Sequence, residues 1–189
     1  MASPDTDSKP ALRRVLRASL PDALSQLAQS IEIRQVLHDW LSHRAERVIS
    51  AFSAIPGEPQ LLPLLSELKD RRWVLPRIEG DSLHFHFVDH TQTELETGPF
   101  GITEPSAIAP LCPTDGVQIF LCPGLGFTPC GKRLGRGKGF YDRSLAQSDS
   151  ESIRVGVCFR EQVHPHLLVD PHDMPMHFLA TPDGVKECR

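Results

Sequence analysis

The sequence has little that would mark a membrane, secreted or nucleic-acid-binding protein. Its 189 residues contain no apolar run near the roughly 20 residues that a membrane-spanning helix needs. The first ten residues, MASPDTDSKP, lack the basic-then-apolar order of a secretory signal. Acidic residues outnumber Lys and Arg by 24 to 20, for a net charge of −4, which argues against general binding of nucleic acid. We therefore expect a cytoplasmic protein with no membrane and no nucleic-acid partner.

Cysteine is also sparse. The five cysteines are scattered and form no Cys-x-x-Cys pair, which is typical of reduced thiols rather than of a disulfide framework or a zinc ribbon. The spacing of four late histidines is irregular and does not indicate a zinc site: His164, His166, His172 and His177. His84 and His86 share one face of an alternating segment, and we expect both to be exposed. Proline is abundant, with 17 residues that mostly end apolar runs, which predicts short connections.

The apolar pattern predicts an α/β domain. Helical spacing is found at residues 10–20, 21–40, 60–68 and 140–147. Strand-like segments lie at residues 47–53, 73–75, 83–88, 116–122, 153–159 and 177–181. The segment at 116–122, GVQIFLC, is nearly continuously apolar, as strands are when both faces of a parallel sheet are covered. We expect about eight disordered residues, then a single domain over 9–189 with a mostly parallel central sheet flanked by helices.

Positive charge is concentrated in two segments. Residues 9–17 carry four basic residues and no acid, and residues 132–143 carry five basic residues and one acid. Each segment sums to +4, so the remainder of the chain sums to −12. Two positive segments in an acidic protein predict local anion sites.

The second basic segment belongs to a glycine-rich loop, GKRLGRGKGFYDR at residues 131–143. Gly135, Gly137 and Gly139 would let the backbone take positive φ and approach a ligand closely. Successive amides that lead into a helix make a concave anion site, and arginine suits bidentate phosphate contacts. The spacing matches neither the Walker A motif nor the dinucleotide fingerprint. A flexible, solvated turn is the alternative, which the preceding buried strand and the five cations disfavour.

The segment PGLGF at 123–127, followed by this loop, resembles the signature of the 5-formyltetrahydrofolate cyclo-ligases, also called 5,10-methenyltetrahydrofolate synthetases. Weaker similarities extend over nearly the whole chain: Lys9 and Arg13, Glu58, FGI at 100–102, Glu104–Pro105, and HDM at 172–174. The resemblance implies an α/β fold related to the sugar-phosphate isomerase and CoA-transferase group. It also implies an enzyme that uses ATP and Mg²⁺ to close 5-formyltetrahydrofolate into 5,10-methenyltetrahydrofolate, with release of ADP and phosphate.

The same resemblance implies the site residues. The ATP-binding set would be Lys9, Arg13, Arg133, Leu134, Gly135, Arg136, Gly137, Lys138, Gly139, Phe140 and Tyr141, with Arg136 and Lys138 also catalytic. The folate-binding set would be Ser53, Ile55, Glu58, Phe140 and Tyr141. Mg²⁺ takes carboxylate oxygens together with phosphates, and the matching positions are Asp142 and Asp173. Taken alone, Asp142 would read as an acid in the first turn of a helix and Asp173 as an acid in a surface turn.

Three positions depart from the family pattern. Phe140 stands where relatives usually have a first tyrosine, so no hydroxyl is available there. Thr128 and His177 stand where relatives often have Asp, and we expect neither to be a direct ligand. They leave room for a second hypothesis, a cyclo-ligase-like protein that binds nucleotide or folate without turnover. A sugar-phosphate isomerase or CoA-transferase relative is a third, which the fold alone would allow. We expect a monomer.

Overall fold

The computed structural model describes residues 8–89, 95–170 and 173–189. Residues 1–7 of the predicted disordered segment, and His172, lie outside this part of the chain. The helices are α1 (Lys9–Ala18), α2 (Ala23–Ser42), α3 (Pro63–Glu67) and α4 (Phe140–Leu145). The strands are β1 (Val48–Ser50), β2 (Arg72–Glu79), β3 (Ser82–Val88), β4 (Leu95–Thr97), β5 (Thr103–Pro105), β6 (Leu111–Cys112), β7 (Ile119–Cys122), β8 (Gly126–Phe127), β9 (Arg133–Leu134), β10 (Ile153–Val157), β11 (Phe178–Thr181) and β12 (Gly184–Glu187).

One eight-stranded sheet forms the centre of the molecule, in the order β12-β11-β10-β7-β1-β2-β3-β6. The five strands from β11 to β2 pair in parallel, whereas β12, β3 and β6 add antiparallel edges. From β1 the chain builds outward through β2 and β3, then returns so that β7 pairs with the other side of β1. The strand order therefore reverses between β1 and β7. The predicted α/β fold with a mostly parallel sheet is confirmed.

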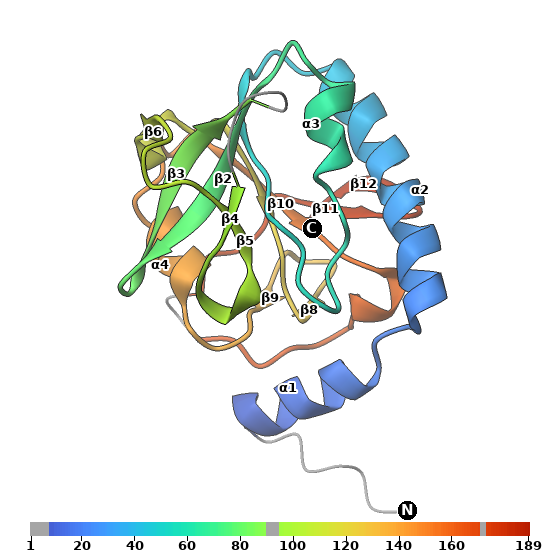
Figure 1. Ribbon diagram of the computed structural model, residues 1–189. Helices are drawn as coiled ribbons and strands as arrows, with labels where there is room; N and C mark the ends of the chain where they lie inside the picture. The colour runs from blue at the N-terminus through green and yellow to red at the C-terminus, as the bar shows by residue number, and fades with distance from the viewer. Residues whose placement is uncertain (1–7, 90–94, 171–172) are drawn as a thin grey trace, which may run out of the picture.

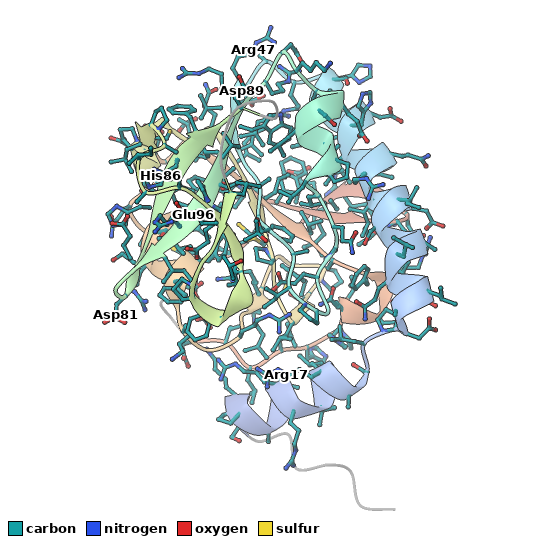
Figure 2. The ribbon with its side chains drawn as sticks, in the orientation of Figure 1. Arg17, Arg47, Asp81, His86, Asp89 and Glu96 are labelled. Atoms are coloured by element: carbon teal, nitrogen blue, oxygen red, sulfur yellow. The ribbon has the colours of Figure 1, made fainter. Side chains whose placement is uncertain are left out.

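Helices cover both faces of this sheet, α2 and α3 on one side and α4 on the other (Figure 1). Alternate residues of β7 divide between the two layers: Ile119 and Leu121 pack in the cluster beneath α2 and α3, whereas Phe120 and Cys122 pack with Leu145 of α4. All four β7 side chains are buried, as expected for a strand covered on both faces. Side chains fill the space on both sides of the sheet (Figure 2).

The two N-terminal helices begin at side-chain caps. The Ser8 hydroxyl accepts the Ala11 N–H at 3.3 Å before α1, and Asp22 accepts the Ser25 N–H at 3.0 Å before α2. In α2 the buried face is formed by residues four apart, Ile33, Leu37 and Leu41. The apolar residues of its first half instead remain at least partly exposed: Leu24, Leu27 and Ile31. No helix among the described residues is long and apolar enough to cross a membrane.

Two details of the β2–β3 pair differ from prediction. The strand predicted at residues 73–75, directly before Pro76, is longer and continues through this proline to Glu79 as β2. β1 pairs with β2 only as far as Val74. Pro76, which has no backbone N–H, lies beyond the end of β1, so no hydrogen bond to that strand is lost. The expectation for His86 is also wrong, because this side chain is buried and its Nδ1 lies 2.7 Å from the Ala109 carbonyl oxygen. The segment that carries Ala109 folds back over β3 before β6, a contact that alternation does not reveal.

A buried arginine completes the C-terminal end of α2. Arg71 Nη2 donates to the carbonyl oxygens of Leu41 at 2.7 Å and Arg44 at 3.2 Å, and Nη1 donates to that of Glu46 at 3.3 Å. Carbonyls in the last turn of a helix have no partner within the helix, so a buried donor stabilises them. Arg71 thereby joins the end of α2 to the start of β2.

Replacing Arg71 by Met should lower the free energy of unfolding by about 2–4 kcal/mol, because buried carbonyl groups lose their donor. Urea unfolding followed by circular dichroism measures the loss. Arg47→Met is the matched control, since Arg47 pairs with Asp70 in a largely exposed ion pair worth less than about 1 kcal/mol. Equal losses in the two variants would contradict this role of Arg71.

Candidate active site

A cavity of about 660 Å³ opens at the carboxyl edge of the parallel strands, where the strand order reverses. Residues that follow β1 form one side, and the loop between β9 and α4 forms another. Ligands of open α/β sheets bind at this place because the loops after the two diverging strands separate and leave a crevice. The position of the cavity thus follows from the topology of the sheet.

Every residue that the sequence predicts for the site lines this one cavity. They are Lys9, Arg13, Ser53, Ile55, Glu58, Arg133, Leu134, Gly135, Arg136, Gly137, Lys138, Gly139, Phe140, Tyr141, Asp142 and Asp173. Residues from α1, from the segment after β1 and from the glycine-rich loop therefore meet despite wide separation in the chain. The structure brings the predicted groups together, and their individual roles remain predictions.

The glycine-rich loop is shaped by two glycines. Gly137 and Gly139 have φ of 111° and 68°, values at which other residues are strained, whereas Gly135 has no positive φ. Arg13 of α1 reaches this loop and donates from Nε to the Gly135 carbonyl oxygen at 2.9 Å. α1 also packs on the loop through Leu16, which shares a small buried cluster with Leu134. The N-terminal helix and the loop thus form one wall of the cavity.

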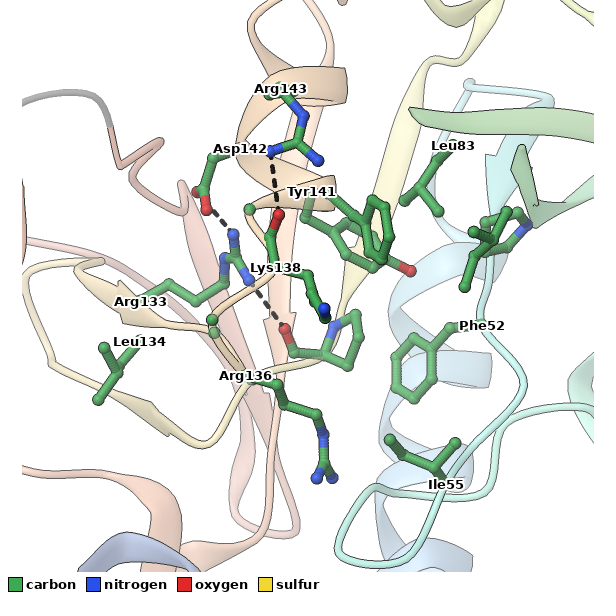
Figure 3. Close-up of a pocket in the computed structure, with 18 of the residues that line it drawn as sticks. Phe52, Ile55, Leu83, Arg133, Leu134, Arg136, Lys138, Tyr141, Asp142 and Arg143 are labelled. Atoms are coloured by element: carbon green, nitrogen blue, oxygen red, sulfur yellow. Dashed lines mark hydrogen bonds and ion pairs between the residues drawn. The ribbon is translucent and has the colours of Figure 1, made fainter. Parts of the chain in front are cut away.

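Arg133 is held inside the wall rather than directed into the cavity. Its Nη2 donates to Asp142 Oδ1 at 2.6 Å and its Nη1 to the Pro123 carbonyl oxygen at 3.3 Å (Figure 3). Only 3% of this side chain is exposed. Asp142 Oδ1 also accepts the Met174 N–H at 3.3 Å, so Asp142 lies close to the segment that carries Asp173. The two acids predicted for the metal therefore approach the cavity from neighbouring backbone.

Lys9 pairs with two acids at the other side of the glycine-rich loop. Its Nζ lies 2.7 Å from Asp170 Oδ2 and 2.6 Å from Asp173 Oδ2. Burial favours the neutral amine, but the hydrogen bonds and charges of the two carboxylates outweigh it and raise the pKa of Lys9. The ammonium form is therefore stabilised where it faces the cavity.

An ion pair between Arg136 and Glu58 crosses the cavity from the glycine-rich loop to the segment after β1. Arg136 Nε donates to Glu58 Oε1 at 2.8 Å, and Arg136 Nη2 donates to the Pro56 carbonyl oxygen at 2.9 Å. Glu58 Oε2 accepts the Ile55 N–H at 3.2 Å. Burial raises the pKa of Glu58, although Arg136 opposes the shift. Each carboxylate oxygen keeps a lone pair for a further donor.

The end of the cavity beyond Glu58 is mostly apolar. Aromatic and aliphatic side chains form it: Phe52, Ile55, Pro76, Ile78, Leu83, Ile102, Phe140 and Tyr141. Figure 3 shows the Phe52, Leu83 and Tyr141 side chains around this space. Among the described residues, the buried hydroxyls of Ser53 and Tyr141 are two of the few buried polar groups without a hydrogen-bond partner. Such groups at a cavity wall are suited to a ligand that is largely apolar and has a few polar atoms.

Several further residues line the cavity without a role predicted from the sequence, among them Phe100, Glu104 and Asp170. Glu104 of β5 is 1% exposed, and Phe100 stands at the turn between β4 and β5 with a φ of 62°. The FGI and Glu104–Pro105 similarities were a signal for these two, but they indicated no contact. Asp170 had no signal, because an acid in a proline-containing loop usually faces solvent. Lys138 Nζ lies 5.8 Å from the centre of the Phe100 ring.

Thr128 and His177, the two departures from the family pattern, do not line the cavity. Thr128 Oγ1 accepts the Lys132 N–H at 3.1 Å and so stabilises the turn before Arg133. His177 Nδ1 accepts the Arg154 N–H at 3.2 Å next to the start of β11. Burial and the charge of Arg154 lower the pKa of His177. Both residues act on the scaffold around the site.

A cationic loop and an apolar pocket meet at the switch point of a parallel sheet, which is the ligand site of open α/β proteins. A sequence model of the 5-formyltetrahydrofolate cyclo-ligase family matches residues 5–182, and the chain belongs to this family. The cyclo-ligase of Mus musculus is 29% identical over 181 residues, which cover 86% of this chain and 89% of that protein. The cyclo-ligase of Mycolicibacterium smegmatis is 29% identical, with coverage of 93% and 94%.

Solved structures agree with this membership. The solution structure of 5,10-methenyltetrahydrofolate synthetase from Aquifex aeolicus superimposes with a TM-score of 0.84 at 30% identity and covers 96% of this chain and 93% of that one. The Mycoplasma pneumoniae synthetase has a TM-score of 0.74 at 24% identity, with coverage of 93% and 99%, and supports the fold alone. The predicted family and the predicted fold are both confirmed.

Glu104 should give the stability of the protein a measurable pH dependence. Its Oε1 accepts the Ile78 N–H at 3.1 Å, and burial raises the pKa of this carboxyl. As the pH rises through the ordinary Glu pKa, the unfolded chain loses this proton before the folded protein does, so the wild type loses stability. Glu104→Gln keeps the acceptor for Ile78 but cannot ionise. The unfolding free energy of both proteins is measured from about pH 4 to pH 8. The variant should gain stability relative to the wild type as the pH rises, and a difference that does not change with pH would contradict the prediction.

Proposed function

We propose that this cavity is where the protein carries out the ATP-dependent cyclisation of 5-formyltetrahydrofolate to 5,10-methenyltetrahydrofolate. The observation that carries the proposal is that a wall of cations and an apolar pocket open into the same space, joined by the Arg136–Glu58 pair. Phosphates suit the cations, and the ring system of a folate suits the pocket. Both substrates could thus meet beside the Arg136–Glu58 pair, between the cationic wall and the apolar pocket.

The reaction needs a leaving group, because a formamide is a poor electrophile. The oxygen of the N5-formyl group attacks the γ-phosphorus of ATP, and the bond to ADP breaks. The N10 amine then attacks the activated formyl carbon and loses its proton, and phosphate leaves with the former formyl oxygen. The products are ADP, phosphate and the cyclic amidinium ion. The protein has to align the two substrates and neutralise charge on the transferred group.

The phosphate side would be formed by the glycine-rich loop and α1. Lys138 and Arg136 would contact the transferred phosphoryl group, and Lys9 and Arg13, which line the same cavity, would reach it from α1. The arginines present several N–H donors in a fixed plane, and lysine supplies a compact charge. Arg133 would act from within the wall, where it fixes Asp142 and the start of the loop.

The folate side would be formed by Ser53, Ile55, Glu58, Phe140 and Tyr141. The Glu58 carboxylate can accept adjacent N–H groups of a pterin through its remaining lone pairs, while Ile55 and the aromatic residues pack on the ring. The Ser53 and Tyr141 hydroxyls, which have no protein partner, could bond to the polar atoms of the ligand. Pterin binding at Glu58 would weaken the Glu58–Arg136 ion pair, so that Arg136 could bind the phosphoryl group instead.

The donor set suits Mg²⁺, which is commonly held by one or two carboxylates together with phosphates and water. Asp142 and Asp173 would supply the carboxylates, and no larger group of metal-ligating side chains occurs among the described residues. Bound there, the ion would neutralise charge on the phosphates of ATP. We further propose a monomer in the cytoplasm, since the predicted site residues line one cavity and need no second copy to complete it, and all five cysteines are free.

Cyclisation can be followed directly through the absorbance of the amidinium product. With 5-formyltetrahydrofolate, ATP and Mg²⁺ present, product should form together with one ADP for each folate consumed. Omission of any one of the three should stop both signals. Binding of ATP and folate without product at saturating concentrations would overturn the proposal and favour the non-catalytic alternative.

Lys138 provides a matched test of the phosphate side. Lys138→Ala should raise the KM for ATP about tenfold to a hundredfold, the range expected for one lost hydrogen bond to a charged group. Lys132→Ala is the control, because Lys132 carries the same charge and is likewise exposed on the same loop but does not line the cavity. Steady-state kinetics with varied ATP measures both variants. Similar KM values for the two would contradict phosphate binding by Lys138.

A further inference from the structure

Asp170 is the cavity residue whose contacts are least explained by the proposed roles. It shares the Lys9 ammonium group with Asp173, at 2.7 Å and 2.6 Å respectively. The exposed fractions of the side chains are 17% for Lys9 and 13% for Asp173, but 50% for Asp170. The backbone N–H of Asp170 also donates to Asp173 Oδ2 at 2.6 Å. One turn therefore fixes the two acids on either side of one lysine.

These contacts conflict with the ligands that the proposed function assigns to Lys9 and Asp173. Lys9 would bind phosphate, whereas Asp173 would bind Mg²⁺. The Lys9 ammonium group lies 2.6 Å from Asp173 Oδ2, and a metal ion bound to the same carboxylate would repel it. Binding of the metal at Asp173 would therefore separate Lys9 from this acid.

Asp170 can still hold the Lys9 ammonium group after Lys9 has separated from Asp173. Lys9 lies in the first turn of α1, and a lysine side chain has a flexible four-carbon stem. Without a partner it would have many orientations in solution, and binding phosphate would then cost side-chain entropy. Asp170 already contacts the same ammonium group. Since that group has three donors, it can keep one bond to Asp170 and direct the others at phosphate.

We propose that Asp170 is a positioning residue, which keeps Lys9 directed at the phosphates of ATP when Asp173 exchanges this lysine for the metal ion. The inference rests on the proposed function. It makes Asp170 act through Lys9 and gives it no direct contact with metal or nucleotide. It also couples the two ligands, because ATP alone leaves Lys9 shared with Asp173, whereas ATP with Mg²⁺ frees it to face the phosphates.

Calorimetric titration with ATP, in the absence of folate so that no turnover occurs, tests this role. Each protein is titrated once with Mg²⁺ and once with a chelator. Asp170→Asn keeps the size of the side chain and should weaken binding of ATP with Mg²⁺ about threefold to tenfold, the scale of one partly exposed ion pair. Binding of ATP with the chelator should be unchanged or tighter, since one negative charge near the phosphates is removed. In kinetics the variant should raise the KM for ATP while kcat stays within about twofold.

The deciding measurement is a double-mutant cycle with Lys9→Met. Asp170→Asn should not weaken binding of ATP with Mg²⁺ when Lys9 is already absent. Glu151→Gln is the control, because Glu151 is exposed, lies outside the cavity and carries the same charge. It should leave affinity in both titrations unchanged.

Three results would overturn the inference while leaving the proposed function intact. An equal weakening by Asp170→Asn with and without Lys9 would indicate that Asp170 contacts the metal itself. Tighter binding in both titrations would indicate a simple charge effect, and unchanged binding would indicate that Asp170 has no role. Unchanged binding of ATP with Mg²⁺ in Lys9→Met would also overturn the inference, because Lys9 would then not contact the phosphates. The proposed function itself would fail differently: the wild type would form no product from 5-formyltetrahydrofolate, ATP and Mg²⁺.

Discussion

The site depends on a constraint of parallel sheets: the carboxyl ends of parallel strands lie at one edge, and a crevice opens where the strand order reverses. In this chain the reversal falls between β1 and β7. The segment after β1 supplies Ser53, Ile55 and Glu58, and the chain after β7 supplies the glycine-rich loop. Neither segment would form a site by itself. Their distance is set by the pairing of β1 with β7, for instance Ile49 with Ile119, deep in the core.

Charge within the cavity is balanced by pairs that the ligands would rearrange. Arg133 pairs with Asp142, Arg136 with Glu58, and Lys9 with Asp173. A concentrated group of unpaired cations would be costly to hold together, so these acids stabilise the loop in the absence of phosphate. The mild net charge of −4 therefore conceals a site in which three of the cations already pair with neighbouring carboxylates. When a triphosphate binds with its metal ion, the phosphates would pair with the cations of the site and the metal ion with its acids.

The sequence predicted the parallel sheet and pointed to the glycine-rich loop because both leave local patterns, whereas Ser53, Glu58 and Asp173 were indicated only by the family resemblance. The apolar run at 116–122 became the buried β7, and the loop from Lys132 to Arg143 became a wall of the cavity. Contacts between distant segments leave no such pattern. The burial of His86 under the segment before β6 and the pairing of Lys9 with Asp170 depend on how the chain returns to itself. The end of β2 was misjudged at Pro76 for the same reason. The sequence of β2 does not show that the neighbouring strand β1 ends before this proline.

The attachment of α1 has a consequence for how such a site can diversify. This helix meets the rest of the protein through a small cluster of its own, Leu16 with Leu125, Leu134 and Leu167, separate from the two large clusters that enclose the sheet. It contributes Lys9 and Arg13 to the cavity but no strand and no part of the main core. Substitutions at the exposed positions of α1 would therefore leave both large clusters intact, whereas a change at Leu16 would reach the glycine-rich loop through Leu134.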